Sequence, residues 1–403
     1  MNYKELYTIT EDLLSKSLTA DEFIKHYNDL QQSNNIFADN EYKPLTYRIQ
    51  CNDDNNDDIM SYNDIVSCND KLYNMLMNNI INHDNIDRSY NRDNKLQNKS
   101  LHKIMTTLIQ QNYKCEHVTT AWVKIYEIYE RFNIFSYFNP NNLLKIFFIC
   151  ELPGAFIFAT NHFIRTKTHL KYDWNAESLN PNIRGDGFKD MFGLVRRYKD
   201  NYDFGPLDGD ITKEENIYYY SNKYKVDLIL SDCGIDVSDK LYEQEKENLI
   251  IFKSKIKMAL NMLNNGGIFI FKTHTLLMKS SIEHLYLLYK SFKDVYIVKP
   301  QSSKKYSNEI YIICINKEYG DYNIINISDI PIEILKCIYK ANENMIYKHM
   351  YSNNINIIKG KYWDNLPEQI INIIQMEKIY VMENFIKSLN IVSINDNDRL
   401  IQY

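Results

Sequence analysis

The sequence predicts an α/β fold in which helices cover both faces of a mainly parallel sheet. Between residue 101 and about residue 318, short apolar runs of strand length alternate with amphipathic stretches of helical length. Such alternation is typical of a parallel sheet with helices packed on both sides. In addition, the apolar run Leu143–Cys150 is followed by Pro153 and Gly154 and then by a helical stretch. Strand, tight glycine turn and helix make the opening unit of a nucleotide-binding α/β fold.

The first hundred residues predict little regular structure. They are mostly polar, with short helical stretches such as Glu11–Leu30. Two segments rich in polar residues, Asn52–Asp58 and Asn82–Ser100, are typical of surface loops or of a linker. We therefore expect residues 1–100 to form a helical, loop-rich extension.

Regular elements are expected from residue 101 onward. Helical spacing of apolar residues predicts helices over Leu101–Gln111, Val118–Phe132, Phe156–Arg165, Leu241–Leu263 and Ile282–Phe292. Apolar runs of strand length predict strands over Leu143–Cys150, Asp227–Leu230, Ile268–Phe271, Val295–Val298 and Ile310–Cys314. From about residue 328 the pattern is helical, most clearly over Pro367–Leu389. The expected division is an α/β domain over residues 101–318 and a helical extension over residues 319–403.

Composition excludes several classes of protein. A hydrophobic content of 44% over 403 residues is that of a globular protein and not of a disordered one. The net charge of -5 gives no overall positive field, so contact with a nucleic acid would need local basic patches. No apolar run reaches the roughly 18 residues of a membrane span, and the first residues lack the apolar region of a signal peptide. The seven cysteines show no paired or metal-like spacing, which predicts free thiols in a reducing compartment and no metal site.

The segment Glu151–Phe156 is a candidate ligand-binding loop. The strand that ends at Cys150 places it at the carboxyl edge of the sheet, where ligands bind in open α/β sheets. Gly154 permits close approach of the backbone to a ligand, and Pro153 stiffens the turn. The segment is not a GxGxxG pattern, so it gives no support for a nicotinamide cofactor. An ordinary turn without a ligand would also explain Pro153 and Gly154 after a strand.

Several short motifs follow one another along roughly residues 100–318. They are Thr120-Ala121-Trp122-Val123-Lys124, Pro153-Gly154-Ala155-Phe156, Gly209-Asp210-Ile211-Thr212, Asp227-Leu228-Ile229-Leu230-Ser231-Asp232, Gly266-Gly267-Ile268-Phe269-Ile270-Phe271-Lys272, and Lys299-Pro300 followed by Glu309-Ile310-Tyr311. In this order the motifs resemble those of the FtsJ-like ribose 2'-O-methyltransferases. The resemblance is greatest to the branch that methylates mRNA caps and to the FtsJ-like proteins of large cytoplasmic DNA viruses.

The resemblance implies a Rossmann-like, S-adenosylmethionine-dependent fold whose last strand is antiparallel, flanked here by helical extensions. It implies a catalytic tetrad, which consists of Lys124, Asp232, Lys272 and Glu309. It also implies residues that contact S-adenosylmethionine, namely Glu151, Leu152, Pro153, Gly154, Ala155, Phe156, Asp210 and Ile211. The chain departs from the family pattern at three positions: Ala155 replaces a second glycine, Lys304 replaces an arginine, and Cys233 replaces a frequent glycine.

The tetrad that the resemblance implies suits removal of a proton from an alcohol. A ribose hydroxyl is a poor nucleophile, and a lysine can accept its proton only if the lysine pKa falls from about 10.4 toward neutrality. Burial and a neighbouring cation lower a lysine pKa, whereas carboxylates raise it. In this interpretation Lys272 is the base, Lys124 supplies a second positive charge, and Asp232 and Glu309 hold the two amines in place.

The resemblance implies RNA as substrate, with the capped 5' end of mRNA as the target. It also implies contact with other capping or transcription proteins, and, for a viral source, a place in the host cytoplasm or in the virion. Candidate phosphate contacts are Arg165 with Lys167, Arg196 with Arg197 and Lys199, and Lys304 with Lys305. A solvated charged face would explain these groups equally well. Tyr198, Tyr202 and Phe204 are candidates for stacking on a base.

Two other functions stay open. One is a non-catalytic RNA-binding or scaffold subunit that keeps the fold, which Ala155 favours and the intact tetrad opposes. The other is a ribosomal or transfer RNA 2'-O-methyltransferase. The likeness of Gly209–Thr212 to the cap-methylating branch favours a cap substrate over this second alternative.

Overall fold

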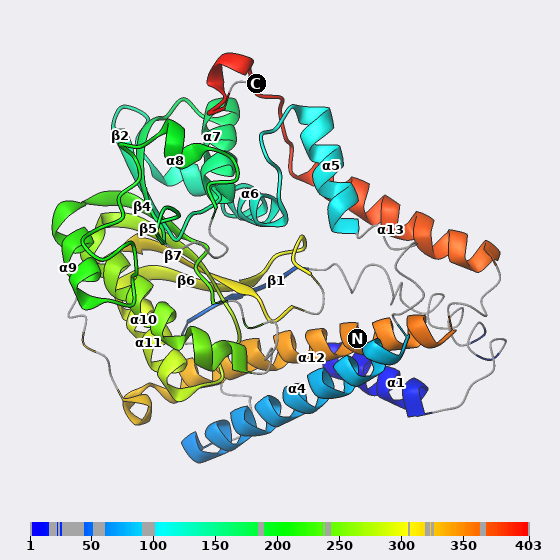
Figure 1. The fold of residues 1–403 in the computed structure, drawn as a ribbon. Coiled ribbons are helices and arrows are strands. Elements are labelled where there is room, and N and C mark those ends of the chain that lie inside the picture. Colours follow the sequence, from blue (N-terminus) through cyan, green and yellow to red (C-terminus); the bar gives the residue numbers. More distant parts are fainter. Residues whose placement is uncertain are drawn as a thin grey trace.

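The computed structural model has a sheet of seven strands at its centre, in the order β1-β6-β7-β5-β4-β2-β3 (Figure 1). The residues that the structure describes are 2–15, 22, 25, 44–50, 61–90, 101–183, 189–235, 237, 243–304, 307–318, 323, 326–362 and 368–401. The strands are β1 (Leu45–Arg48), β2 (Leu143–Ile149), β3 (Lys171–Glu177), β4 (Val226–Ser231), β5 (Leu263–Thr273), β6 (Phe292–Lys299) and β7 (Ile310–Lys317). Strands β3, β2, β4 and β5 are parallel neighbours, β7 is antiparallel to β5 and β6, and β1 is antiparallel to β6. The expected α/β sheet, mainly parallel with an antiparallel last strand, is confirmed.

Helices lie on both faces of this sheet (Figure 1). One cluster of buried apolar side chains includes residues from five helices. They are α5 (Leu101–Tyr113), α6 (Thr120–Phe132), α7 (Ala155–Lys167), α8 (Leu194–Arg197) and α13 (Glu368–Ser388). A second cluster contains α9 (Glu214–Lys223), α10 (Gln244–Met262), α11 (Lys279–Ser291) and the start of α12 (Ile332–Tyr362). The amino-terminal extension contributes two further helices, α1 (Tyr3–Ser15) and α4 (Tyr62–Tyr90).

Alternate residues of the central strands face the two helical layers, because successive side chains of a strand point to opposite faces. Phe148 and Leu230 are buried in the cluster with α6 and α7. Their neighbours Phe147 and Ile229 are buried in the cluster with α10 and α11. A strand buried on both faces has a continuous apolar sequence, which is why β2, β4 and β5 could be predicted.

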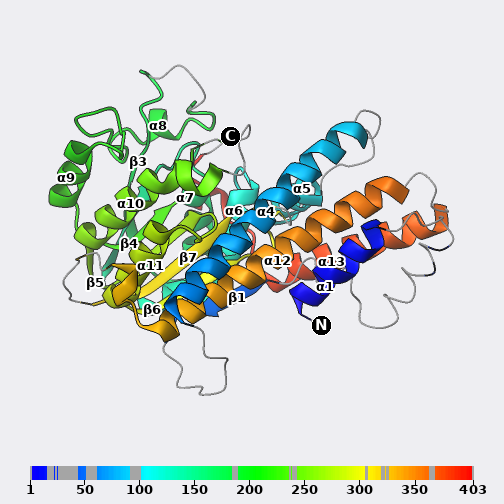
Figure 2. The same cartoon turned by 90° about the horizontal axis from the view of Figure 1, so that it is seen from below.

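The two extensions pack against each other. Leu72, Leu76 and Ile80 recur at four-residue spacing along α4 and are buried in one cluster with Met350 and Tyr351 of α12. Helix α1 packs on α12 as well. Figure 2 shows α1, α4 and α12 side by side, so segments from the two ends of the chain form one helical layer.

Two strands were not expected from the sequence. Strand β1 is four residues long and joins the sheet from within the amino-terminal extension, where it pairs with β6. Strand β3 reads Lys171 to Glu177 with few apolar residues, and it pairs with β2 at the far edge. Edge strands of this kind carry too little apolar periodicity to be recognised in a sequence.

The expectation of a connector over Asn82–Ser100 is wrong for its first half, because residues up to Tyr90 belong to α4. The apolar stripe Leu72, Leu76 and Ile80 of α4 packs on α12, and the helix continues past this stripe to Tyr90 despite the weak helix propensity of Asn. Residues 91–100 and the segment Asn52–Asp58 lie outside the described residues. A helix was expected over Glu11–Leu30, and the structure has α1 over Tyr3–Ser15. Most of residues 16–30 lie outside the described residues.

The division of the chain at residues 100 and 318 stays a prediction. Among the helices of the described ranges, none is long and apolar enough to cross a membrane.

Candidate active site

The structure brings Lys124, Asp232, Lys272 and Glu309 together at the carboxyl edge of the sheet. Asp232 directly follows β4, and Lys272 lies at the end of the parallel neighbour β5. Because β7 runs antiparallel to β5, its first residue Ile310 pairs with Thr273, and Glu309 therefore lies at the same edge.

These residues form two ion pairs. Lys124 Nζ lies 2.5 Å from Glu309 Oε1, and Lys272 Nζ lies 2.9 Å from Asp232 Oδ1. The two pairs are close enough for Lys272 to interact electrostatically with Glu309. The site thus holds two amines against two carboxylates, all from segments that are distant in the sequence.

Lys124 is positioned by a helix that is otherwise largely apolar on its buried side. The side chain of Thr119 caps the start of α6 by accepting a hydrogen bond from the Trp122 amide. Trp122, Val123 and Ile125 are wholly buried, and Lys124 between them is 7% exposed. A buried amine requires a partner charge, which Glu309 provides.

The charges at this edge shift the pKa of Glu309 and Lys272 in opposite directions. Burial raises the pKa of Glu309, but Lys124 and Lys272 outweigh burial and lower that pKa to about 2. Burial lowers the pKa of Lys272, but the Asp232 and Glu309 carboxylates outweigh it and hold the pKa above its usual value. The protein alone therefore shifts Lys272 away from the neutral amine that a general base needs.

The loop Glu151–Phe156 links the end of β2 to the start of α7. Glu151 Oε1 accepts a hydrogen bond of 2.6 Å from the Phe156 amide, so the carboxylate caps the helix. Gly154 has φ +112°, and a Cβ atom there would collide with Leu194 Cδ1. Leu152 and Pro153 are partly exposed, Ala155 is mostly buried, and Phe156 is wholly buried. Phe156 therefore anchors the loop in the core, while Leu152 and Pro153 remain at its rim.

Glu177 is a candidate site residue that sequence reasoning missed. It ends β3, and its Oε1 accepts a hydrogen bond of 2.8 Å from the Cys150 amide. Within the described part of the chain, Oε2 of Glu177 and Oε2 of Glu151 are both buried without a hydrogen-bond partner. Burial raises the pKa of each carboxyl to about 8, assisted by Asp232 at Glu151 and by Asp210 and Asp203 at Glu177. An acid that follows the glycine loop and ends the next strand is a signal for ribose binding, but the strand itself was not recognised.

Asp210 lies close to Glu177, and Ile211 follows it in the chain. Gly209 has φ +73°, and a Cβ atom there would collide with the backbone oxygen of Ser178, so only glycine permits this approach. Asp210 Oδ1 accepts hydrogen bonds from the amide and the hydroxyl of Thr212, and Ile211 is buried. The structure therefore brings the two separate groups of expected cofactor contacts to one end of the sheet.

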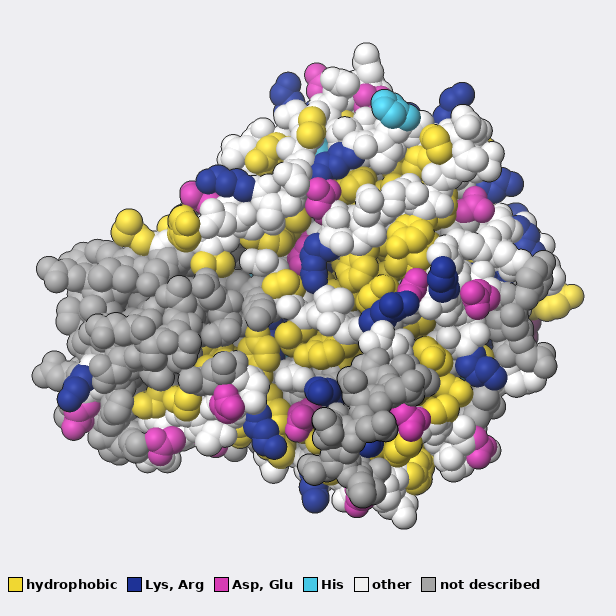
Figure 3. Space-filling view, turned by 180° about the vertical axis from the view of Figure 1, so that it is seen from behind, with side chains coloured by type: hydrophobic (Ala, Val, Ile, Leu, Met, Phe, Trp, Pro, Cys, Tyr) yellow, Lys and Arg dark blue, Asp and Glu magenta, His cyan; other side chains and the backbone are white. Residues whose placement is uncertain are grey.

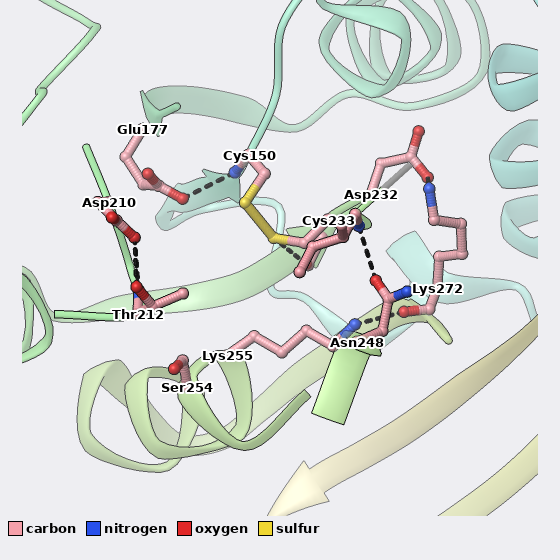
Figure 4. The surroundings of a disulfide bond; sticks show 12 residues. Cys150, Glu177, Asp210, Thr212, Asp232, Cys233, Asn248, Ser254, Lys255 and Lys272 are labelled. Carbon is pink, nitrogen blue, oxygen red and sulfur yellow. Dashed lines mark hydrogen bonds and ion pairs between the residues drawn. A yellow bond between two sulfur atoms is a disulfide. The ribbon is translucent and has the colours of Figure 1, made fainter. Parts of the chain in front are cut away.

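The expectation that all cysteines are free thiols is wrong for one pair. Cys150 and Cys233 form a disulfide with a Cα–Cα distance of 5.1 Å. They follow the neighbouring parallel strands β2 and β4, so they lie side by side despite a sequence separation of 83 residues, which spacing alone cannot reveal. Figure 4 shows the disulfide between Glu177 and Asp210 on one side and Asp232 and Lys272 on the other.

Four described cysteines lie outside the disulfide, and the two disulfide sulfur atoms lie near the Glu177 carboxylate. Among the described residues the cysteines outside this disulfide are Cys68, Cys115, Cys314 and Cys337. The ligand atoms of Cys150, Cys233 and Glu177 lie within 4.8 Å of one another, a separation that would suit a metal ion. In this structure the two sulfur atoms are bonded to each other instead.

Several of the expected phosphate contacts are occupied by protein groups. Lys167 pairs with Glu130 at 2.7 Å, and Arg197 donates a hydrogen bond of 3.0 Å to the backbone oxygen of Leu400. Tyr202 is buried, so its ring cannot stack on a base. On the face drawn in Figure 3, described Lys and Arg side chains are interspersed with Asp and Glu rather than gathered into one patch.

Two more of the residues expected to contact RNA also interact with protein groups. Arg165 lies 5.3 Å from the centre of the Tyr172 ring, and the hydroxyl of Tyr198 donates to the backbone oxygen of Leu400. Lys304 is exposed, and Lys305 lies outside the described residues.

Comparison with known proteins agrees with this geometry. A family model described as FtsJ-like methyltransferase matches residues 117–317, the range that contains the four tetrad residues and the loop. Through this domain the chain belongs to the FtsJ-like methyltransferases. The resemblance noted in the sequence is thereby confirmed.

Relatives of the FtsJ-like domain come from animals and from viruses. Cap-specific mRNA (nucleoside-2'-O-)-methyltransferase 2 of Drosophila melanogaster is 31% identical over 228 residues, which are 53% of this chain and 32% of that protein. The African swine fever virus protein EP424R (isolate Pig/Kenya/KEN-50/1950), described as a probable methyltransferase, is 32% identical over 224 residues, 52% of this chain and 51% of that protein. The chain thus spans a third to a half of the length of these relatives.

Among solved structures, a ribosomal RNA methyltransferase from Plasmodium falciparum aligns with 48% of this chain and 95% of that chain. The sequence identity is 21% and the TM-score is 0.32.

Proposed function

We propose that this protein is an S-adenosylmethionine-dependent RNA ribose 2'-O-methyltransferase that acts on the cap-proximal nucleotide of mRNA. The observation that carries the proposal is the pair of ion pairs, Lys124 with Glu309 and Lys272 with Asp232, at the carboxyl edge of the sheet. Membership of the FtsJ-like family supports methyl transfer. The names of the animal relatives support the cap as the target.

The residues at the edge of the sheet fit the cofactor. S-adenosylmethionine, when bound, would supply the methyl group and a positively charged sulfonium. Glu177 and Glu151 each present a buried carboxylate oxygen without a donor, and such oxygens suit ligand hydroxyl and ammonium groups. The loop residues at the rim, together with Asp210 and Ile211, would complete the binding site.

Lys272 is the residue to which we assign removal of the ribose proton. In the protein alone its pKa lies above the usual value because of Asp232 and Glu309. A positive charge bound at the same edge opposes this, because like charges disfavour the protonated amine. Loading of the cofactor site would therefore shift Lys272 toward the neutral form that accepts a proton, while Lys124 adds a second positive charge beside Glu309.

Viral relatives support a viral source for the chain. The host cytoplasm or the virion as its location, and contact with other capping or transcription proteins, are part of the same proposal.

The deciding experiment measures where the methyl group is placed. Purified protein and labelled S-adenosylmethionine are incubated with short RNAs that are capped or uncapped, and whose first ribose is normal or 2'-deoxy. The products are digested with nuclease and identified by mass spectrometry. We expect a 2'-O-methylated first nucleotide on capped RNA and none on the 2'-deoxy RNA.

Each alternative function gives a different result. If structured ribosomal or transfer RNA is offered as well and is preferred over capped RNA, the protein is a ribosomal or transfer RNA 2'-O-methyltransferase. RNA binding without any methyl transfer would establish the non-catalytic subunit. Methylation of a base on either RNA would overturn the proposal altogether.

A further inference from the structure

A recess lies beside the catalytic carboxylate Glu309, between the sheet edge and α12. It contains about 400 Å³ of empty space, part of it open to solvent. Asn308 and Ile310, the two neighbours of Glu309 in the chain, line it on the sheet side. Lys348 and His349 line it from α12. It thus adjoins the tetrad, and its outer wall comes from a helix beyond the FtsJ-like domain over residues 117–317.

The recess is cationic. Lys299 and Lys348 line it together with His349, whereas none of the described lining residues is an Asp or a Glu. Both lysines are buried, with exposures of 6% for Lys299 and 3% for Lys348. The carboxylate of Glu309 is nearby, but its Oε1 is occupied by Lys124 at 2.5 Å.

Lys299 is held by neutral groups. Its Nζ donates to the backbone oxygens of Ser307 and Glu309, and among the described residues it makes no ion pair. Burial, opposed by Glu309 and assisted by Lys348 and Lys124, lowers the pKa of Lys299 to about 7. A buried amine without a counter-ion is stabilised when an anion enters beside it.

Two of the other polar side chains that line the recess, His349 and Asn342, are fixed by hydrogen bonds. The Asn353 amide donates to His349 Nε2 at 3.0 Å, so a neutral His349 ring carries its proton on Nδ1. Asn342, which also lines the recess, donates to the backbone oxygen of Leu276 at 2.8 Å and is thereby fixed. The lining combines positive charge with fixed polar groups, as phosphate-binding sites do.

We propose that this recess binds one phosphate group of the RNA substrate, with Lys348 and Lys299 as its cationic wall and His349 beside them. The inference rests on the proposed function, because it takes RNA as the source of the anion. The position next to Glu309 places the phosphate beside the site of methyl transfer. Phosphate contacts fix the register of a nucleic acid without reading its sequence. The carboxy-terminal extension would then complete the RNA-binding site of the FtsJ-like domain.

The test compares Lys348→Met and Lys348→Arg in the full chain. Methionine keeps the buried stem and removes the charge, whereas arginine keeps the charge. Lys340→Met is the matched control, because Lys340 is exposed on the same helix. Binding of fluorescent RNA is measured by anisotropy at several KCl concentrations. The RNAs carry a 5'-hydroxyl, a 5'-triphosphate or a cap. Folding is checked by thermal unfolding, and Lys348→Gln replaces the methionine variant if that variant does not fold.

We expect Lys348→Met to bind RNA about tenfold more weakly, and the slope of log K against log salt to become shallower by about 0.7, the value for one phosphate contact of a single strand. Lys348→Arg and Lys340→Met should stay within about threefold of the wild type. Equal loss with all three RNAs would assign an internal phosphodiester. Loss confined to the triphosphate and capped RNAs would assign the 5' phosphate bridge.

Three results would overturn the inference: unchanged RNA affinity and salt slope in Lys348→Met, equal losses in the methionine and arginine variants, or weakened binding of S-adenosylmethionine with RNA binding intact. The last result would mean that the recess holds the cofactor carboxylate. Methyl transfer is measured in parallel. Absence of methyl transfer by the wild type would refute the proposed function, whereas the RNA-binding comparison would still decide the phosphate site.

Discussion

Lys124 Nζ lies 2.5 Å from Glu309 Oε1, although 185 positions separate the two residues in the chain. The pair connects a helix of one layer to the start of the antiparallel strand β7. Both side chains are largely buried, at 9% and 16% exposure. The contact therefore stabilises the fold as well as setting the charge of the site.

Replacement of Lys124 by Met should lower the free energy of unfolding at pH 7 by about 3 kcal/mol, because a buried carboxylate loses its partner. The Glu309 pKa of about 2 lies below its usual value. Its contribution to stability is therefore present above pH about 4.5 and is lost as the pH falls toward 2. Urea unfolding at pH 7 and at pH 3.5 should show a large deficit at the first pH and a smaller one at the second.

The control for this prediction is Lys290→Met, since Lys290 is an exposed residue on α11. It should change stability by less than about 0.5 kcal/mol at either pH. A Lys124→Met deficit that is the same at both pH values would show that lost packing, and not the ion pair, is responsible.

Replacement of Lys272 by Ala should abolish methyl transfer while leaving the affinity for S-adenosylmethionine within a few-fold. The amine acts on the ribose hydroxyl in the proposed mechanism, and removal of a general base typically lowers turnover by about 10² to 10⁴. Single-turnover methyl transfer and calorimetry with the cofactor measure the two quantities. Lys253→Ala, at an exposed position of α10, is the control. Near wild-type turnover of a folded Lys272→Ala protein would mean that another group accepts the proton.

The resemblance to the family located the tetrad in the sequence, and its motifs could be recognised because they stand on strongly apolar elements. Strands β4 and β5, which precede Asp232 and contain Lys272, are buried on both faces and so have continuous apolar sequences. Glu177 could not be found in the same way, because β3 is an edge strand with mostly polar residues. The pairing of Cys150 with Cys233 depends on strand order, which spacing in the sequence does not contain.

The recess beside Glu309 shows a different limit of prediction. Lys348 and His349 are ordinary residues within a long helical pattern, and nothing in that pattern distinguishes them from exposed Lys340. Only the packing of α12 against the sheet edge brings them near the tetrad. Motifs thus located the four tetrad residues within the FtsJ-like domain, whereas Glu177 and the residues that α12 contributes required the tertiary structure.

Replacement of Glu177 by Gln should make the stability of the protein less dependent on pH between about 5 and 8. Burial raises the pKa of Glu177 to about 8, so in this interval the folded chain holds a proton that the unfolded chain has lost. Stability attributable to this group therefore falls as the pH rises, by up to about 1.4 kcal/mol per pH unit. Urea unfolding of both proteins at pH 5.5, 6.5 and 7.5 measures the difference.

Above pH 8 the comparison also tests the cofactor site. Glutamine is a weaker acceptor for hydroxyl donors than a carboxylate, so S-adenosylmethionine should bind the variant about tenfold more weakly there. Parallel stability curves for the two proteins would mean that Glu177 is ionised in the folded chain throughout. Equal cofactor affinity would remove Glu177 from the proposed binding site.

Reduction of the Cys150–Cys233 disulfide should lower the free energy of unfolding by about 2 to 5 kcal/mol, because the bond constrains a long loop of the unfolded chain. Urea unfolding with and without a phosphine reductant measures this, and the mass of the intact chain should rise by the two hydrogen atoms gained. The double variant Cys150→Ser with Cys233→Ser should unfold like the reduced protein and should not respond to the reductant. Cys337→Ser, at a cysteine outside the disulfide, should respond as the wild type does. Identical wild-type unfolding curves in both conditions would mean that the two thiols are not bonded in solution.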